Sequence, residues 1–280
     1  MKNIWQKNKN YGSESFLLES QKLLESETHI FLSIFRKIRN SSNDIDVGVG
    51  TLIIAFIDSS RSLLLLAKNQ KLRDSYLCAR TIIEIILNIG FFSAKGKPAI
   101  DKAMNYAKQK SYRDLNRKLH IGEIFVGIGL NDFDKIPVDE ELKKCIEEFT
   151  STKGKEIRSW TNESTTDKIA IISEKYGKDL GTVLSFSLFI IYRYASEIAH
   201  ASLFGEFFVL GRTLLENERP KTNLEVQKFQ LTCLTEIILC IYLAAQSIIP
   251  VLNKHYDVQD ELNKSKKNLS AFKRNYLLKK

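Results

Sequence analysis

Apolar residues recur three and four positions apart along most of this chain, which is the spacing of a helix that buries one face. Phe31, Ile34, Phe35 and Ile38 show this spacing near the start. Polar linkers separate the apolar stretches, so the pattern predicts a series of long helices. Their expected ranges are 13–39, 47–67, 72–93, 98–119, 139–149, 183–202 and 223–252. The fold class we predict is all-α, a single multi-helix bundle.

Two stretches interrupt this pattern. Gly122, Gly127 and Gly129 stand among Ile and Val residues, and their spacing matches neither a dinucleotide-binding loop nor a phosphate-binding loop. We therefore predict a surface connection over 122–137. The stretch 205–211, with the sequence GEFFVLG, is predicted to be an exposed apolar loop or a short strand.

Positive charge is concentrated at the two ends of the chain. The formal net charge is +9, of which residues 1–12 supply +3 and residues 254–280 supply +5. A nearly neutral body does not match a folded nucleic-acid platform, but basic ends can steer a chain toward RNA, DNA or an acidic membrane. We divide the chain into an N-terminal helix packing on the bundle (1–44), a helical core domain (45–253) and a basic amphipathic tail (254–280). The tail either docks on the body or on a second copy, or serves as a nucleic-acid arm.

The cysteines and histidines show no metal-ligand spacing. Cys78, Cys145, Cys233 and Cys240 form no Cys-x-x-Cys pair, and the four histidines are scattered. The cysteines are predicted to be small core residues in a reducing compartment. We expect no cofactor, no metal and a cytoplasmic location.

One apolar stretch, 231–252, is long enough to cross a bilayer. It carries Glu236, Gln246 and Pro250, and the central helix of a soluble bundle explains it better. Residues 1–12 lack the apolar core of a signal peptide. No stable membrane insertion is therefore expected.

Polar side chains gather on the helix expected at 183–202, which otherwise looks buried almost all round. Arg193 and His200 project to nearly the same side, about 10 Å apart along the axis. Glu197 can reach either of them, and Ser196 lies one turn before His200. This polar patch is either an internal clamp or the wall of a site, because buried charges have to be paired.

A second polar line follows the helix expected at 72–93. Arg80 and Glu84 are four residues apart, and Asn88 continues the line by another turn. The line either pairs with the polar patch of the 183–202 helix or forms a self-contained pair that fixes the helix register.

Three segments of the chain, taken in order, resemble a known family. They are Ala79-Arg80-Thr81-Ile82-Ile83-Glu84, then Trp160 with Ser164 and Ile169-Ala170, then Tyr192-Arg193-Tyr194-Ala195-Ser196-Glu197-Ile198-Ala199-His200. The bacterial family catalogued as domain of unknown function 5677 shares an Arg-x-x-x-Glu helix, a Trp-Ser-Leu-Ala-like segment and a Tyr-Arg-x-x-Ser-x-x-x-His-like end. The resemblance covers about residues 45–250. It implies an all-helical cytoplasmic domain and brings no established activity.

Arg193 and His200, as Arg-x6-His on one helix, also resemble the Arg-x4–6-His element of HEPN (higher eukaryotes and prokaryotes nucleotide-binding) domains. Many of those domains are metal-independent ribonucleases of toxin and anti-phage systems, and they act as dimers. Tyr194 stands where such proteins often carry Asn, Asp or His. This resemblance implies an HEPN-like centre of the bundle.

The function implied is a metal-independent endoribonuclease or toxin-type effector of a bacterial defence or toxin–antitoxin system. His200 is the expected general base or acid, Arg193 stabilises charge on the scissile phosphate, and Glu197 orients the histidine. The residues expected to support them are Arg80, Glu84, Ser196 and Tyr192. The alternative is a non-enzymatic helical interaction protein of such a system, with the polar residues as a clamp. The expected partners are RNA and either a second copy or another protein.

Overall fold

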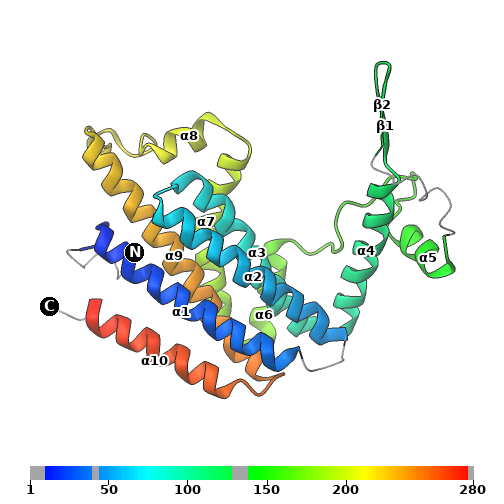
Figure 1. Ribbon diagram of the computed structural model, residues 1–280, viewed down its shortest axis with the longest axis horizontal. Coiled ribbons are helices and arrows are strands. Elements are labelled where there is room, and N and C mark those ends of the chain that lie inside the picture. The colour runs from blue at the N-terminus through cyan, green and yellow to red at the C-terminus, as the bar shows by residue number, and fades with distance from the viewer. Residues whose placement is uncertain (1–9, 40–43, 128–137, 277–280) are drawn as a thin grey trace. The chain divides into compact units, whose positions relative to one another are not determined.

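A computed structural model of the protein describes residues 10–39, 44–127 and 138–276, and helices dominate it (Figure 1). The helices are α1 (Glu14–Ile38), α2 (Asp44–Lys68), α3 (Leu72–Lys95), α4 (Lys97–Leu115), α5 (Glu140–Glu148), α6 (Thr165–Tyr176), α7 (Lys178–Ala199), α8 (Leu203–Val209), α9 (Asn223–Asn253) and α10 (Gln259–Tyr276). Strands β1 (Lys118–Ile121) and β2 (Ile124–Gly127) form one antiparallel hairpin. The prediction of an all-α fold is confirmed.

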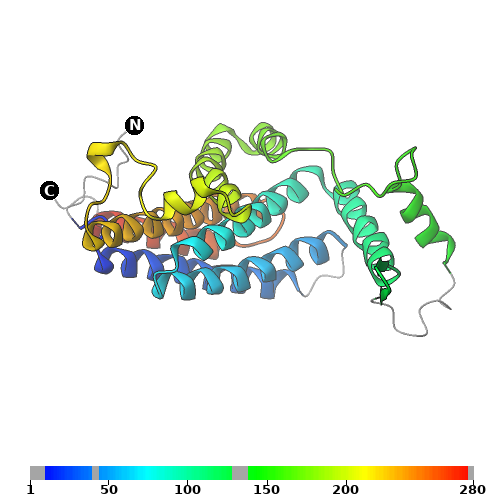
Figure 2. The same cartoon turned by 90° about the horizontal axis from the view of Figure 1, so that it is seen from above.

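The chain divides into two compact units. The first joins the residues up to Ala94 with those from Thr165 onward, and the second comprises Lys95–Ser164. The first unit therefore contains α1, α2, α9 and α10, which run alongside one another in Figures 1 and 2, together with α3 and α6–α8.

Helices α3 and α9 form the centre of the first unit. Gly90 of α3 lies so close to Ile172 of α6 and Ile248 of α9 that an added Cβ would come within 2.9 and 3.0 Å of them. On another side of α3, the Cys78 thiol donates to the Ser59 carbonyl oxygen of α2 at 3.2 Å. In α9 every residue from Ile237 to Tyr242 is buried, as expected of a central helix.

Helix α1 holds the outer helices to this centre. Its Phe31 ring packs on Phe56 of α2 with the ring centroids 4.4 Å apart. One turn earlier on α1, the Glu27 carboxylate accepts a hydrogen bond from Ser265 of α10 at 2.8 Å. Phe272 of α10 is buried as well, so the basic tail docks on the body, one of the two alternatives left open by the sequence.

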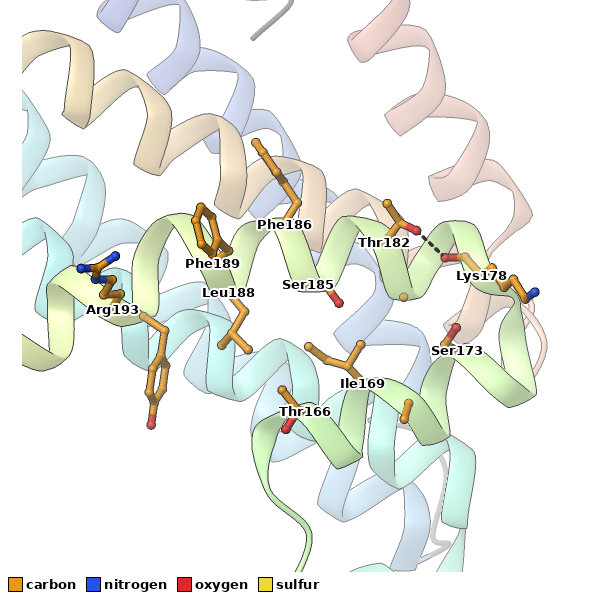
Figure 3. Close-up of a pocket in the computed structure, with 13 residues that line it drawn as sticks. Thr166, Ile169, Ser173, Lys178, Thr182, Ser185, Phe186, Leu188, Phe189 and Arg193 are labelled. Atoms are coloured by element: carbon orange, nitrogen blue, oxygen red, sulfur yellow. Dashed lines mark hydrogen bonds between the residues drawn. The ribbon is translucent and has the colours of Figure 1, made fainter. Parts of the chain in front are cut away.

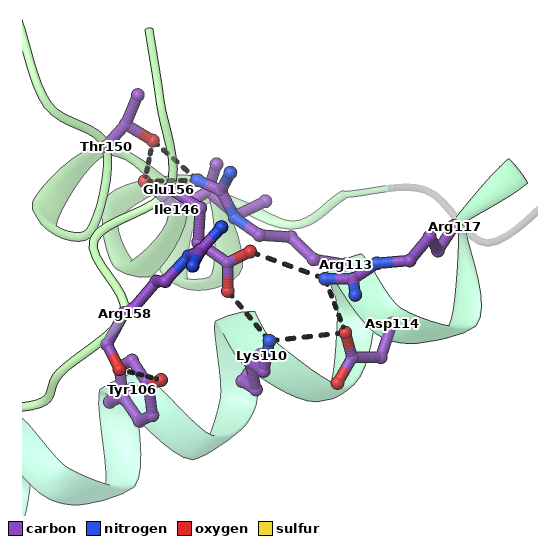
Figure 4. A network of polar contacts seen from close by, with 9 residues as sticks. All are labelled: Tyr106, Lys110, Arg113, Asp114, Arg117, Ile146, Thr150, Glu156 and Arg158. Atoms are coloured by element: carbon purple, nitrogen blue, oxygen red, sulfur yellow. Dashed lines mark hydrogen bonds and ion pairs between the residues drawn. The ribbon is translucent and has the colours of Figure 1, made fainter. Parts of the chain in front are cut away.

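The second unit is built from α4, α5 and the hairpin, and ion pairs hold its parts together (Figure 4). Lys110 of α4 contacts both Asp114 and Glu156, at 3.3 and 3.1 Å. Arg113 donates to the Ile146 carbonyl oxygen at the end of α5 at 3.1 Å. These contacts join α4 to the segments around α5, and they explain the polar character of α4.

Three local expectations were wrong. Residues 203–209 form helix α8 instead of a loop or strand, because Ser202 caps it by accepting a hydrogen bond from the Gly205 N–H at 3.1 Å. Part of the expected connection at 122–137 is the second strand of the hairpin, whose turn uses Gly122 at a φ of +60°; residues 128–137 lie outside the described part of the chain. Finally, α7 is not buried all round, since Phe186 and Phe189 are 40% and 70% exposed.

Three of the described helices are long and apolar enough to cross a membrane, judged by length and composition. They cover 46–68, 72–95 and 223–253. In the first of them only 39% of the most apolar window is buried within the protein, against 72% in α9.

Candidate functional site

The C-terminal half of α7 carries Arg193, Glu197 and His200 into a corner of the chain. His200 caps the helix, and its backbone N–H donates to the Ser196 carbonyl oxygen at 3.1 Å. The next residue, Ala201, adopts a positive φ of 49° and turns the chain toward α8. The side chains of Arg193 and His200 are both exposed to solvent at this corner.

Glu197 stabilises the turn between α7 and α8. Its carboxylate accepts a hydrogen bond from the Ser202 hydroxyl at 2.7 Å, and the same hydroxyl caps α8. Gly205 lies against the backbone of α7, where a Cβ would come within 2.9 Å of the Glu197 carbonyl carbon. Glu197 therefore fixes the angle between α7 and α8, and through it the position of His200.

Arg80, Glu84 and Tyr192 form a separate group between α3 and α7. The Arg80 guanidinium lies over the Tyr192 ring, 4.4 Å from its centroid, and donates to the Tyr192 hydroxyl at 3.0 Å. It also contacts the Glu84 carboxylate at 3.3 Å. Arg80 and Glu84 thus form an ion pair within α3. The contact of this pair with α7 is made through Tyr192.

Of the two alternatives left open by the sequence, the single shared cluster is therefore not formed. Among the described residues, no hydrogen bond or ion pair joins Arg80 or Glu84 to Glu197 or His200. Asn88, the third residue of the polar line, accepts a hydrogen bond from Lys168 of α6 at 2.8 Å. Arg193 and His200 are exposed, so they are not the buried charges that the clamp hypothesis required.

An aromatic stack borders the corner. The Tyr194 ring lies parallel to Phe208 of α8 with centroids 3.8 Å apart, and Tyr76 of α3 approaches both edge-on. The Arg193 guanidinium lies 5.8 Å from the Phe204 ring centroid. The Tyr194 ring therefore supports α8.

A groove runs along α7 and ends at Arg193 (Figure 3). It has a volume of about 1020 Å³, and α6 forms its other wall. Leu188 and Ile169 line its apolar interior, and Phe189 lies at its rim. The sequence pattern did not predict this groove, because an uninterrupted apolar run does not reveal which of its faces stays uncovered.

The described residues contain no group of three His, Cys, Asp or Glu side chains able to hold a metal ion. The four cysteines are free thiols, and Cys145, Cys233 and Cys240 are buried. Burial raises the pKa of the Cys78 thiol to about 11, so it is protonated at neutral pH. Cys145, Cys233 and Cys240 are small core residues, as predicted, whereas Cys78 is half-buried.

Comparison with protein families gives one finding. A family of unknown function, DUF5677, matches residues 46–217, which include α3, α6, α7 and the corner at His200. The chain belongs to this family. The match confirms the first of the two resemblances and extends over most of the range expected for it. No curated protein and no solved structure matches the chain.

Proposed function

We propose that the protein is a metal-independent endoribonuclease or toxin-type effector of a bacterial defence or toxin–antitoxin system. The observation that carries the proposal is the pair Arg193 and His200, exposed together at the end of α7 and engaged in no ion pair with a described acidic side chain. Because both side chains are exposed and unpaired among the described residues, a ligand can reach them without breaking a contact of the fold.

The chemistry of RNA cleavage suits this pair. The imidazole of His200 removes the proton of a ribose 2′-hydroxyl, or returns one to the leaving 5′-oxygen, because a histidine changes charge near neutral pH. The guanidinium of Arg193 offers hydrogen bonds to a phosphate whose negative charge grows during the attack. Glu197 acts as a positioning residue through the α7–α8 corner, and Arg80 and Glu84 position Tyr192.

The test compares His200→Ala with His29→Ala, which changes another exposed histidine, on α1. We expect His200→Ala to slow cleavage of a single-stranded RNA by about 100-fold or more. Its melting temperature should stay within about 2 °C of the wild type, because the ring has no partner among the described residues. His29→Ala should change neither property. The same cleavage rate in His200→Ala and the wild type would refute the proposal.

A second candidate function, a non-enzymatic interaction protein in such a system, is favoured by a different observation. Large apolar side chains are exposed on α7 and α8, among them Phe189 at 70%, Leu203 at 74% and Phe207 at 43%. Apolar side chains gathered on one face of a protein usually mark a surface that a partner covers. We propose a second copy or another protein as that partner, and a cytoplasmic location without membrane insertion.

A further inference from the structure

We infer that the groove between α6 and α7 is a docking site for an amphipathic helix of a partner protein, with acidic residues at both ends of the docked segment. The inference goes beyond the proposed ribonuclease and shares Arg193 with it. It rests on the shape of the groove, on its apolar interior and on the charges at its two ends.

The shape comes from the way α6 and α7 meet. Gly177 joins the two helices, and just beyond it Gly181 lies so close to Ser173 that an added Cβ would come within 2.6 Å of the Ser173 Cβ. From this tight contact the helices diverge, so that Thr166 and Leu188 face each other across open space in Figure 3. A wedge between two diverging helices accepts a third helix, whose side chains fill the space as a ridge fills a groove.

The lining of the groove is apolar. Buried Ile169 and half-buried Leu188 form its floor, and Phe186 and Phe189 stand beside it with 40% and 70% of their surface exposed. The hydroxyl of Thr182, which also lines it, donates back to the Lys178 carbonyl oxygen at 2.9 Å and offers no proton to a ligand. A ligand in this groove therefore gains mainly by removing apolar surface from water, as helix-in-groove complexes do.

The two ends of the groove carry positive charge. Lys178 stands at one end and Arg193 at the other, about 22 Å apart along α7 at 1.5 Å per residue. Neither side chain makes an ion pair with a described residue, and no acidic residue lines the groove. A docked helix of about 15 residues reaches both cations, so acidic residues near its two ends complement the groove.

Two other occupants fit less well. An acyl chain has a single anionic head group and uses only one of the two cations. A second copy of this chain would have to insert a helix with acidic residues at both ends. Helix α5 has such residues at each end, but its apolar Leu142 and Cys145 are buried within its own unit and are not available to the groove. A separate protein segment with acidic ends satisfies the charge and the length together.

The experiment uses the full-length protein and a labelled 18-residue helical peptide with an apolar face at i, i+3, i+4 and i+7 and two glutamates at each end. Fluorescence anisotropy should show saturable binding that weakens with salt. Phe189→Glu should weaken it at least about tenfold, and Lys178→Glu by about three- to tenfold, because exposed ion pairs are individually modest. Leu65→Glu on α2, an apolar position that is 63% exposed against 70% for Phe189, is the control and should bind as the wild type does.

A charge swap sharpens the result. A peptide with lysines in place of the glutamates should bind the wild type poorly and recover affinity for the double variant Lys178→Glu/Arg193→Glu, in which both ends of the groove are acidic. Equal binding of both peptides to the wild type, or unchanged binding to Phe189→Glu, would overturn the inference. So would light scattering that shows a wild-type dimer broken by Phe189→Glu, or anionic vesicles that bind in place of the peptide. His200→Ala should bind the peptide normally, which separates this test from that of the ribonuclease.

Discussion

Glu27 places a carboxylate inside the contact between α1 and α10. Its side chain is fully buried, and both oxygens lie within 3.0 Å of the Ser265 hydroxyl, which can donate only one proton. Burial raises the pKa of Glu27 to about 7, since the hydrogen bond compensates only part of the lost hydration. The neutral form of this side chain is therefore the one that the fold accommodates.

We expect the stability of the protein to fall as the pH rises from about 4.5 to about 7 and beyond. In this window the unfolded chain releases the Glu27 proton while the folded chain still holds it, so the free energy of unfolding decreases by about 3 kcal/mol for a shift of this size. Urea unfolding of the wild type and of Glu27→Gln at pH 5 and pH 8 measures it. Glu27→Gln should lose most of that decrease, leaving the smaller share from Glu236, whose pKa burial also raises. An unaltered difference between the two pH values in Glu27→Gln would count against this account.

The exposed pair Arg193 and His200 was the part of the site that sequence alone could locate, because their spacing on a helix fixes a common side. The contact partners of the other predicted site residues could not be predicted from spacing. Tyr192 as the partner of Arg80, and Ser202 as the partner of Glu197, depend on how α3 meets α7 and on how the chain turns at Ala201. Such contacts join residues from different elements, and helical periodicity carries no information about them.

At the scale of elements, the long helices followed from periodicity because one face of each is apolar and the others are polar. α1 and α3 keep nearly their expected ranges for this reason. The run preceding Arg193 is apolar on every side, so periodicity could not show that α6 and α9 cover only part of it. The apolar pattern of 205–211 was equally ambiguous between a strand and a helix. The N-cap Ser202 favours the helix.

Helix α10 illustrates how a basic segment can also be a structural one. Leu262 and Phe272 are buried, and Glu261 pairs with Lys37 of α1 at 2.8 Å, while Lys266 and Lys267 face solvent. The apolar stripe docks on the body, and the lysines on the outer side remain free to meet an anionic partner.

Two variants separate these roles of α10. Truncation after Asn253 should lower the free energy of unfolding by about 5 kcal/mol, because Val258, Leu262 and Phe272 lose their burial. The double change of Lys266 and Lys267 to Gln should leave the melting temperature nearly unchanged. If the outer face contacts single-stranded RNA, the double variant should also reduce the log–log salt slope of binding by about 1.4, or 0.7 for each lost phosphate contact. A truncated protein as stable as the full chain would contradict the docking.

At the scale of the whole molecule, the residues matched by the family and the residues of the first compact unit are not the same. The match ends at residue 217, whereas the first unit also contains α1, α9 and α10. Helix α9 is the most buried of the three, and Gly90 of α3 lies directly against its Ile248. The family signature therefore lies in a part of the chain whose core is completed by helices outside the match.

This arrangement predicts that residues 46–217 alone do not fold cooperatively. Without α1, the Phe56 ring loses its stacking partner Phe31, and without α9 the faces of α3 and α7 that pack on it lie open to water. Each large apolar side chain left exposed costs about 1.5–3 kcal/mol, and a few of them exceed the stability of an ordinary domain. Near-UV circular dichroism and thermal melting of the 46–217 fragment should show no fixed tertiary structure. The fragment 10–276, which contains every described element, should melt in a cooperative transition. A cooperative melt of the shorter fragment would show that the core of the family is complete without α1, α9 and α10.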